Sequence, residues 1–207
     1  MENKLTNTES LRIIEQMISR AKNEDKDSGK GWIIWGWMLT TVSIIHYILI
    51  VYGVRGAGNV WNVFGVFGLA LIAFSIYRRR TKSSGDTVKT YTGELVDKIS
   101  DAFFISLIVS VIGAATTGAF NTGVNFGYLL LLYAFWLYIH GAAFRFEPMK
   151  YGAYVNWLGA LAIFLWYREL GKNVLLVHAF CVALGYIIPG YMAQRKFDQQ
   201  VNTSVNG

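Results

Sequence analysis

The sequence predicts an all-α membrane protein, in which six transmembrane helices form a bundle behind a cytoplasmic N-terminal amphipathic helix. Three observations predict this fold class. Of the 207 residues, 54% are hydrophobic and only 15% are charged, whereas a soluble domain carries about 25% charged residues. The charged residues are confined to short stretches between long apolar runs, and tryptophans gather where the first run begins. The chain therefore divides into a polar segment 1–30, a membrane domain 31–194 and a polar tail 195–207, which we expect to be disordered.

The N-terminal segment contains the pattern of an amphipathic helix. Thr6 and Glu9 match a capping box, with a hydroxyl at the N-cap and a carboxylate three residues later. Apolar side chains then recur at helical spacing, which predicts a helix over residues 7–22: Leu11, Ile14, Ile18 and Ala21. This helix either packs on the cytoplasmic face of its own bundle or in the lipid headgroups, or it docks onto a partner protein or a second copy of the chain.

The first membrane span begins at a cluster of tryptophans. Residues 31–53 include no Asp, Glu, Lys or Arg, and this run exceeds the roughly 20 residues that a helix needs to cross a bilayer. Trp32, Trp35 and Trp37 open the run, and indole rings favour the membrane–water interface. We expect a transmembrane helix over 32–52, with these three side chains as its interfacial belt.

Five further apolar runs predict the other spans, over residues 60–77, 101–120, 126–144, 151–167 and 173–192. A short glycine-rich turn separates the first two spans, and three consecutive basic residues follow the second as topology anchors: Arg78, Arg79 and Arg80. Most Lys and Arg residues lie in the N-terminal segment, after the second and fourth spans, and in the tail. Because basic connections stay in the cytoplasm, we expect both termini there. The net charge of +6 therefore reflects topology and does not indicate a nucleic-acid partner.

Two spans carry further local signals. The third has a stripe of small residues four apart, which predicts close packing against another helix: Ser106, Ser110, Ala114 and Gly118. The sixth contains Pro189 followed by Gly190. Because Pro189 has no N–H to donate to the carbonyl of Gly185, we expect a kink there and regard the pair as a candidate hinge.

No catalytic or metal-binding motif is present in the sequence. The predicted spans contain no charged residue apart from Asp101 at a boundary, which argues against a proton- or sodium-coupled transporter. The polar residues that remain are candidates for a polar interior: His46, His140, His178, Asn62 and Asn156. A bis-histidine haem held by His46 and His178 is conceivable, but hydrogen bonds between helices explain these residues more simply. We therefore expect no cofactor, no metal and no enzyme activity.

Four motifs also carry a family resemblance. They are Glu9-Ser-Leu-Arg-Ile-Ile-Glu-Gln-Met-Ile18, Trp35-Gly-Trp37, Phe144-Arg-Phe-Glu-Pro148 and Ile188-Pro-Gly-Tyr191. In these motifs the chain resembles a group of uncharacterised bacterial multi-span membrane proteins. The resemblance implies a six-span membrane protein of bacterial type, and we expect it in the cytoplasmic (inner) membrane. It implies no activity, and it transfers no functional residues.

Two functions follow from these patterns. The first is a non-enzymatic regulatory, scaffolding or interaction subunit that sits in the lipid bilayer and binds a protein partner or a second copy through its N-terminal helix. The second is a small transporter or channel for a neutral or apolar solute, with the kink at Pro189 and Gly190 as its hinge. A haem-binding redox protein is a distant third alternative.

Overall fold

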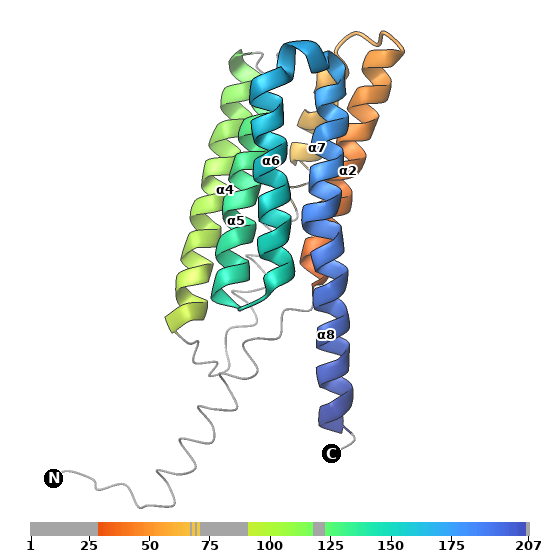
Figure 1. Cartoon of the computed structure of the whole chain (residues 1–207). Helices are drawn as coiled ribbons and strands as arrows, with labels where there is room; N and C mark the ends of the chain where they lie inside the picture. Colours follow the sequence, from red (N-terminus) through yellow and green to blue (C-terminus); the bar gives the residue numbers. More distant parts are fainter. Residues whose placement is uncertain (1–28, 67, 69, 71–90, 118–122, 206–207) are drawn as a thin grey trace, which may run out of the picture.

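The computed structural model describes residues 29–66, 68, 70, 91–117 and 123–205, and all regular structure in these residues is helical (Figure 1). The main helices are α2 (Lys30–Val51), α4 (Tyr91–Thr117), α5 (Val124–Ala143), α6 (Glu147–Leu170), α7 (Val174–Val182) and α8 (Ile188–Val205). Short 3-10 turns, η1 (Ala57–Asn59) and η3 (Gly171–Asn173), and a π-helical turn, η4 (Ala183–Ile187), connect some of them. The predicted all-α class is therefore confirmed.

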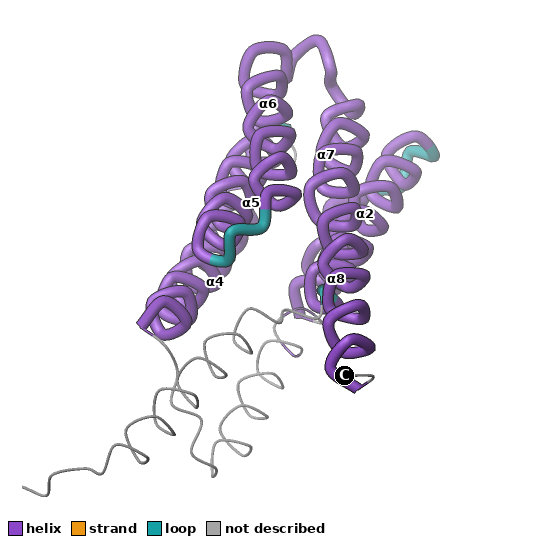
Figure 2. Tube along the Cα trace, turned by 60° about the horizontal axis from the view of Figure 1, so that its bottom comes forward, coloured by secondary structure: helices purple, strands orange, loops and turns teal. Residues whose placement is uncertain are grey.

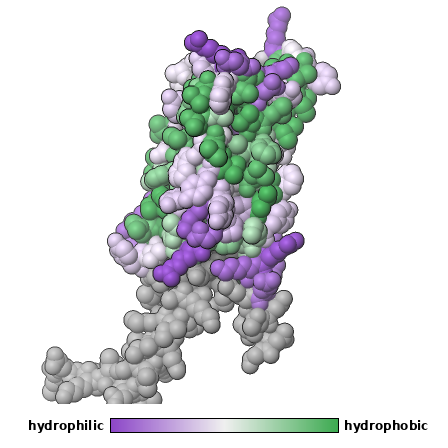
Figure 3. Space-filling model, viewed as in Figure 1, coloured by the Kyte–Doolittle hydropathy of each residue, from purple (hydrophilic) through white to green (hydrophobic). Residues whose placement is uncertain are grey.

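Four described stretches are long and apolar enough to cross a membrane: Lys30–Val51, Tyr91–Thr117, Val124–Ala143 and Glu147–Gln199. The last of them spans 53 residues, and the chain reverses within it at η3, so that α6 and α7 lie side by side (Figure 1). Apolar side chains cover the middle of the molecule and polar ones its two ends (Figure 3). This distribution is typical of a protein that spans a bilayer.

The predicted spans over 32–52, 101–120, 126–144, 151–167 and 173–192 overlap described helices, with different boundaries. The third span begins earlier than predicted, because α4 already starts at Tyr91. Of the second span only 60–66, 68 and 70 are described, and these residues are helical. The N-terminal helix predicted over 7–22 and the anchors Arg78, Arg79 and Arg80 lie outside the described residues. Helix α8 continues to Val205, so the tail is helical where we expected disorder; between Met192 and Val205 it contains no Gly or Pro to end a helix.

The helices form two layers. One layer holds α4, α5 and α6, and the other holds α2 beside α7 and α8 (Figure 2). Glycines bring the layers together, since a Cβ built on Gly152 of α6 would lie only 2.6 Å from the carbonyl oxygen of Gly185 in η4. Helix α4 is the least buried of the candidate membrane spans. Only 17% of the residues in its most apolar stretch are buried, against 56% for α5.

The small-residue stripe on α4 takes little part in this packing. Ala114 is buried, but Ser106 and Ser110 are exposed, and Gly118 lies outside the described residues. The buried face of α4 is instead formed by larger side chains at heptad-like spacing, namely Val96, Phe103 and Leu107 together with Ala114. A role of the stripe in packing against another chain stays a prediction.

The predicted irregularity at Pro189 takes the form of a widened turn. Residues 183–187 form one π-helical turn directly before Pro189, while α7 and α8 continue in nearly the same direction (Figure 1). Side-chain Nδ2 of Asn156 donates to the carbonyl of Cys181 at 3.3 Å and to that of Gly152 at 2.8 Å. Asn156 is fully buried, and it therefore binds a carbonyl just ahead of the widened turn, where regular α-helical bonding breaks down.

Candidate functional site: a buried histidine cluster and a lateral cavity

The most polar part of the core is a pair of hydrogen bonds between α2 and α7. His178 on α7 is completely buried, and its Nδ1 lies 2.8 Å from Oγ of Ser43 on α2. The same hydroxyl donates to the carbonyl of Leu39 at 2.8 Å. Because a hydroxyl has a single proton, both contacts are satisfied when Nδ1–H of His178 donates to Ser43. Nε2 of His178 then carries a buried lone pair, and it has no hydrogen-bond partner among the described residues.

His46 on α2 has the opposite proton arrangement. The indole Nε1–H of Trp61 donates to its Nδ1 at 2.9 Å. Indole nitrogen is only a donor, so Nδ1 of His46 must be the accepting nitrogen, and the proton of the neutral ring lies on Nε2. His46 is 3% exposed and Trp61 is 6% exposed, so this hydrogen bond fixes the helix that begins at Val60 against α2.

Aromatic rings fill the space between these two imidazoles. The ring of Phe126 lies 6.1 Å from that of His46 and 5.3 Å from that of His178, measured between centroids. The ring of Trp61 lies 6.4 Å and 5.9 Å from the same two imidazoles. We name the set His46, Trp61, Phe126, Tyr133, His178 and Ser43 the histidine cluster.

The histidine cluster does not fit a bis-histidine haem. An axial ligand presents a lone pair to the iron and directs its other ring nitrogen to a second partner. His178 has that form, but Trp61 occupies the accepting nitrogen of His46, and the rings of Trp61 and Phe126 fill the space that a macrocycle would need. In the described part of the chain, no group of three or more His, Cys, Asp or Glu residues is placed to hold a metal ion.

The third histidine belongs to a separate aromatic cluster, at the end of the bundle where α2 begins. His140 Nδ1 lies 3.1 Å from the carbonyl oxygen of Trp136, one turn earlier on α5, and its Nε2 lies 3.4 Å from Oγ of Ser100 on α4. Trp32 packs against both rings, at 4.5 Å from Trp136 and 5.0 Å from His140. This cluster joins α2, α4 and α5.

The three tryptophans of the first span therefore lie in different environments. Trp32 is buried, Trp35 is half-buried, and only Trp37 is largely exposed, at 51%. On a helix, residues 32 and 35 lie on neighbouring faces while residue 37 points elsewhere. Trp37 alone is thus placed as an outward-facing member of the expected interfacial belt.

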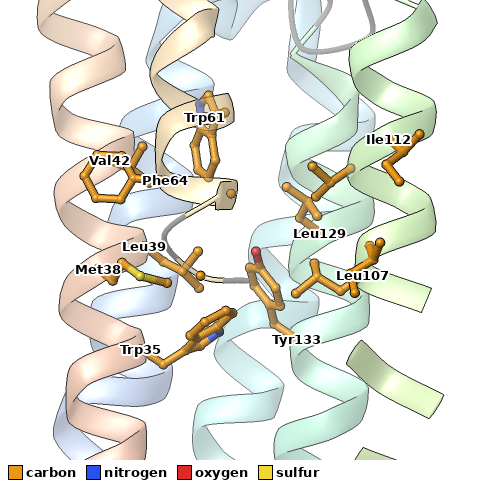
Figure 4. Close-up of a pocket in the computed structure, with 14 residues that line it drawn as sticks. Trp35, Met38, Leu39, Val42, Trp61, Phe64, Leu107, Ile112, Leu129 and Tyr133 are labelled. Atoms are coloured by element: carbon orange, nitrogen blue, oxygen red, sulfur yellow. The ribbon is translucent and has the colours of Figure 1, made fainter. Parts of the chain in front are cut away.

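A cavity of about 120 Å³ lies next to the histidine cluster, between the two layers. Its walls come from α2, the helix that begins at Val60, α4 and α5 (Figure 4). We name it the lateral cavity, and its described lining residues are Trp35, Met38, Leu39, Val42, Trp61, Phe64, Gly65, Gly68, Leu107, Ile108, Val111, Ile112, Leu129 and Tyr133. None of these carries a charge. Ile112, at its edge, is 59% exposed, so the cavity reaches the apolar side surface of α4.

Two side chains in the wall of the lateral cavity, Tyr133 and Trp35, carry a hydrogen-bond donor without a partner among the described residues. The hydroxyl of Tyr133 on α5 is directed between the side chains of α2 and those of α4 (Figure 4). The ring below it is 1% exposed and packs at 5.9 Å from His178 and at 5.9 Å from Tyr186. No hydrogen bond joins this hydroxyl to any residue that the structure describes. Tyr133 and Trp61 thus belong both to the cavity wall and to the histidine cluster.

The structure places most of the predicted polar residues inside. His46, His140, His178 and Asn156 are buried, as is Asn125, which the sequence did not single out. Asn62 lies on the exposed side of its helix. Tyr133 and Ser43 also lie inside, and the sequence did not indicate what they face, because a tyrosine or serine in an apolar span is commonplace.

Comparison with known proteins yields no relative: no family model, no curated protein and no solved structure matches this chain.

Proposed function

We propose that this chain is a non-enzymatic, multi-pass membrane protein that acts as a regulatory or interaction subunit and responds to a small neutral molecule bound in its helix bundle. The observation that carries the proposal is the lateral cavity, whose described walls are uncharged and whose edge meets the apolar side surface at Ile112. Concave, mostly apolar sites with few polar groups are typical of small-molecule binding. The described histidines are engaged with neighbouring side chains or backbone, which suits a structural role better than catalysis.

The proposal includes six membrane passes, with both termini in the cytoplasm of a bacterial inner membrane. It is supported by the distribution of Lys and Arg along the sequence, by the chain reversal at η3 and by the helical residues after Val60. A reporter fused after Arg80 should report a cytoplasmic position. An external position there would contradict this topology.

Co-purification tests the proposed function directly. The full-length chain would be extracted from its native membrane in mild detergent, and everything bound to it would be identified by mass spectrometry. We expect a stoichiometric protein partner that is lost when residues 1–22 are deleted, while the bundle still elutes as a folded particle. Retention of the same partner by the deleted chain would contradict the role of the N-terminal helix.

The same purified preparation tests whether a small molecule is bound in the lateral cavity. Gly65 lines the lateral cavity, and a Cβ built on it has open space around it. A Gly65→Leu chain should therefore fill the cavity and lose a small molecule that the natural chain retains. Gly113 on α4 is the matched control, because a Cβ there also meets nothing within 4 Å and Gly113 does not line the cavity. Equal retention by both variants would argue against a ligand in this cavity.

A second function, a small transporter or channel for a neutral or apolar solute, is favoured by the π-helical turn before Pro189. Such widened turns are frequent at functional sites. Solute flux into liposomes should then fall when Pro189→Ala restores the missing N–H. Gly190 is unsuited to this test, since a Cβ there would lie 3.0 Å from the backbone nitrogen of Ile33 and push α8 away from α2. Absence of flux in the natural chain would remove this alternative.

A further inference from the structure

We infer that the lateral cavity binds a neutral molecule with one planar ring and an oxygen that accepts a hydrogen bond from Tyr133. This inference rests on the proposed function, because it specifies the class of molecule to which the bundle responds. Size, wall chemistry, the position of one hydroxyl and the route of access all point to this class.

The size of the cavity limits its occupant to about one ring. Its volume is about 120 Å³, and an apolar protein cavity of about 150 Å³ is known to bind benzene. A molecule with several fused rings would extend out of such a space toward the side surface at Ile112. A flexible chain would have to be ordered on binding and so would lose conformational entropy that a rigid ring does not lose.

The walls of the cavity favour a planar, uncharged molecule. Aromatic side chains from three helices surround it: Trp35, Trp61, Phe64 and Tyr133 (Figure 4). Aromatic rings gain from offset or edge-to-face contact with another ring beyond the burial of area alone. No lining residue that the structure describes is charged, so an ionic ligand would be buried without a counter-charge at a large cost.

The hydroxyl of Tyr133 is the reason to expect a hydrogen-bond acceptor on the ligand. It points into the cavity from a ring that is 1% exposed (Figure 4). It has no hydrogen-bond partner among the described residues, and Nε1 of Trp35 is a second unpaired donor in the same wall. Buried polar groups in proteins are usually paired, and a phenol can donate to an oxygen of the ligand. A ring that carries an oxygen therefore satisfies this hydroxyl, whereas a plain hydrocarbon leaves it unpaired.

Access from the lipid phase suits the same class of molecule. Ile112 is 59% exposed and lies at the edge of the cavity, in the apolar stretch of α4. A neutral ring compound partitions into lipid, and from there it reaches the cavity without passing a charged surface.

Two probes that differ by a single oxygen test the inference: 4-fluorophenol and fluorobenzene. The full-length protein would be placed in lipid nanodiscs, with empty nanodiscs as the blank, and binding would be followed by ¹⁹F NMR. Tyr133→Phe removes one oxygen atom from the cavity wall. It should weaken binding of 4-fluorophenol about two- to ten-fold, the range expected for one net hydrogen bond, and change binding of fluorobenzene less than about two-fold. For each probe, binding to the variant is compared with binding of the same probe to the natural chain, so that differences in lipid partitioning between the two probes cancel.

Cavity variants locate the binding. Gly65→Leu should abolish binding of both probes, while Gly113→Leu should leave it unchanged. If neither probe binds the natural chain, a lipid acyl chain is the better occupant and the inference is overturned. If Tyr133→Phe affects both probes equally, the hydrogen bond is refuted, while the cavity and the proposed function still stand. The co-purified molecule described above tests the proposed function independently of either probe.

Discussion

Gly152 is the position where one added methyl group should most disturb the bundle. A Cβ built there would lie 2.6 Å from the carbonyl oxygen of Gly185 and 3.0 Å from its Cα. Favourable contacts between heavy atoms begin near 3.5 Å, and both atoms belong to backbone, which cannot rotate away. A Gly152→Ala substitution must therefore push α6 away from the π-helical turn by roughly 1 Å.

The expected cost has two parts. Overpacking of a tight contact costs about 1–3 kcal/mol. The hydrogen bond from Asn156 to the carbonyl of Cys181 is already 3.3 Å long, and its loss on separation adds about 0.5–1.5 kcal/mol. The sum, about 1.5–4.5 kcal/mol, should lower the unfolding midpoint by roughly 3–18 °C.

The assay is thermal unfolding of the purified protein in detergent, followed by tryptophan fluorescence. Gly113→Ala is the control, because a Cβ there meets nothing within 4 Å. It should show only the effect of helix propensity, a gain of up to about 1 kcal/mol. If Gly152→Ala unfolds at the same temperature as Gly113→Ala, then α6 and the π-helical turn do not approach each other as the structure shows.

Two further predictions concern the histidine cluster. Trp61→Phe removes the donor to His46 and should destabilise the protein by about 1–3 kcal/mol, whereas Trp37→Phe, at a position that is 51% exposed, should change stability by less than about 0.5 kcal/mol. Ser43→Ala leaves Nδ1 of the buried His178 unpaired, with a similar cost of about 1–3 kcal/mol. The same unfolding assay measures both, and a Trp61→Phe chain as stable as Trp37→Phe would contradict the hydrogen bond to His46.

The sequence predicted the long apolar helices α2, α4, α5 and α6, because a bilayer constrains such helices strongly. A chain that buries its backbone in lipid must form long apolar helices, and those are visible as runs without charge. Helix ends were less predictable. The start of α4 at Tyr91 and the helical residues up to Val205 lie in polar sequence, where hydropathy carries no signal and helix propensity decides.

The histidine cluster was only half predictable. The sequence indicated that His46 and His178 lie inside, because an ionisable residue in an apolar span needs a partner. It did not indicate which partners they have. Ser43 and His178 are 135 residues apart, and their pairing depends on the rotation of α2 and α7 about their own axes. The form of the irregularity before Pro189 was hidden for the same reason, since Asn156, which binds the carbonyl of Cys181, comes from a different helix.

The lateral cavity and the histidine cluster share two side chains, and this sharing restricts how a ligand can act on the protein. Trp61 is held by its hydrogen bond to His46, and the ring of Tyr133 is fixed between His178 and Tyr186. These walls are therefore rigid. Helix α4 forms the opposite wall and is the least buried of the candidate spans, at 17%. Under the proposed function, we expect a ligand that fills the cavity to displace α4 more readily than α2 or α5, which are more deeply buried.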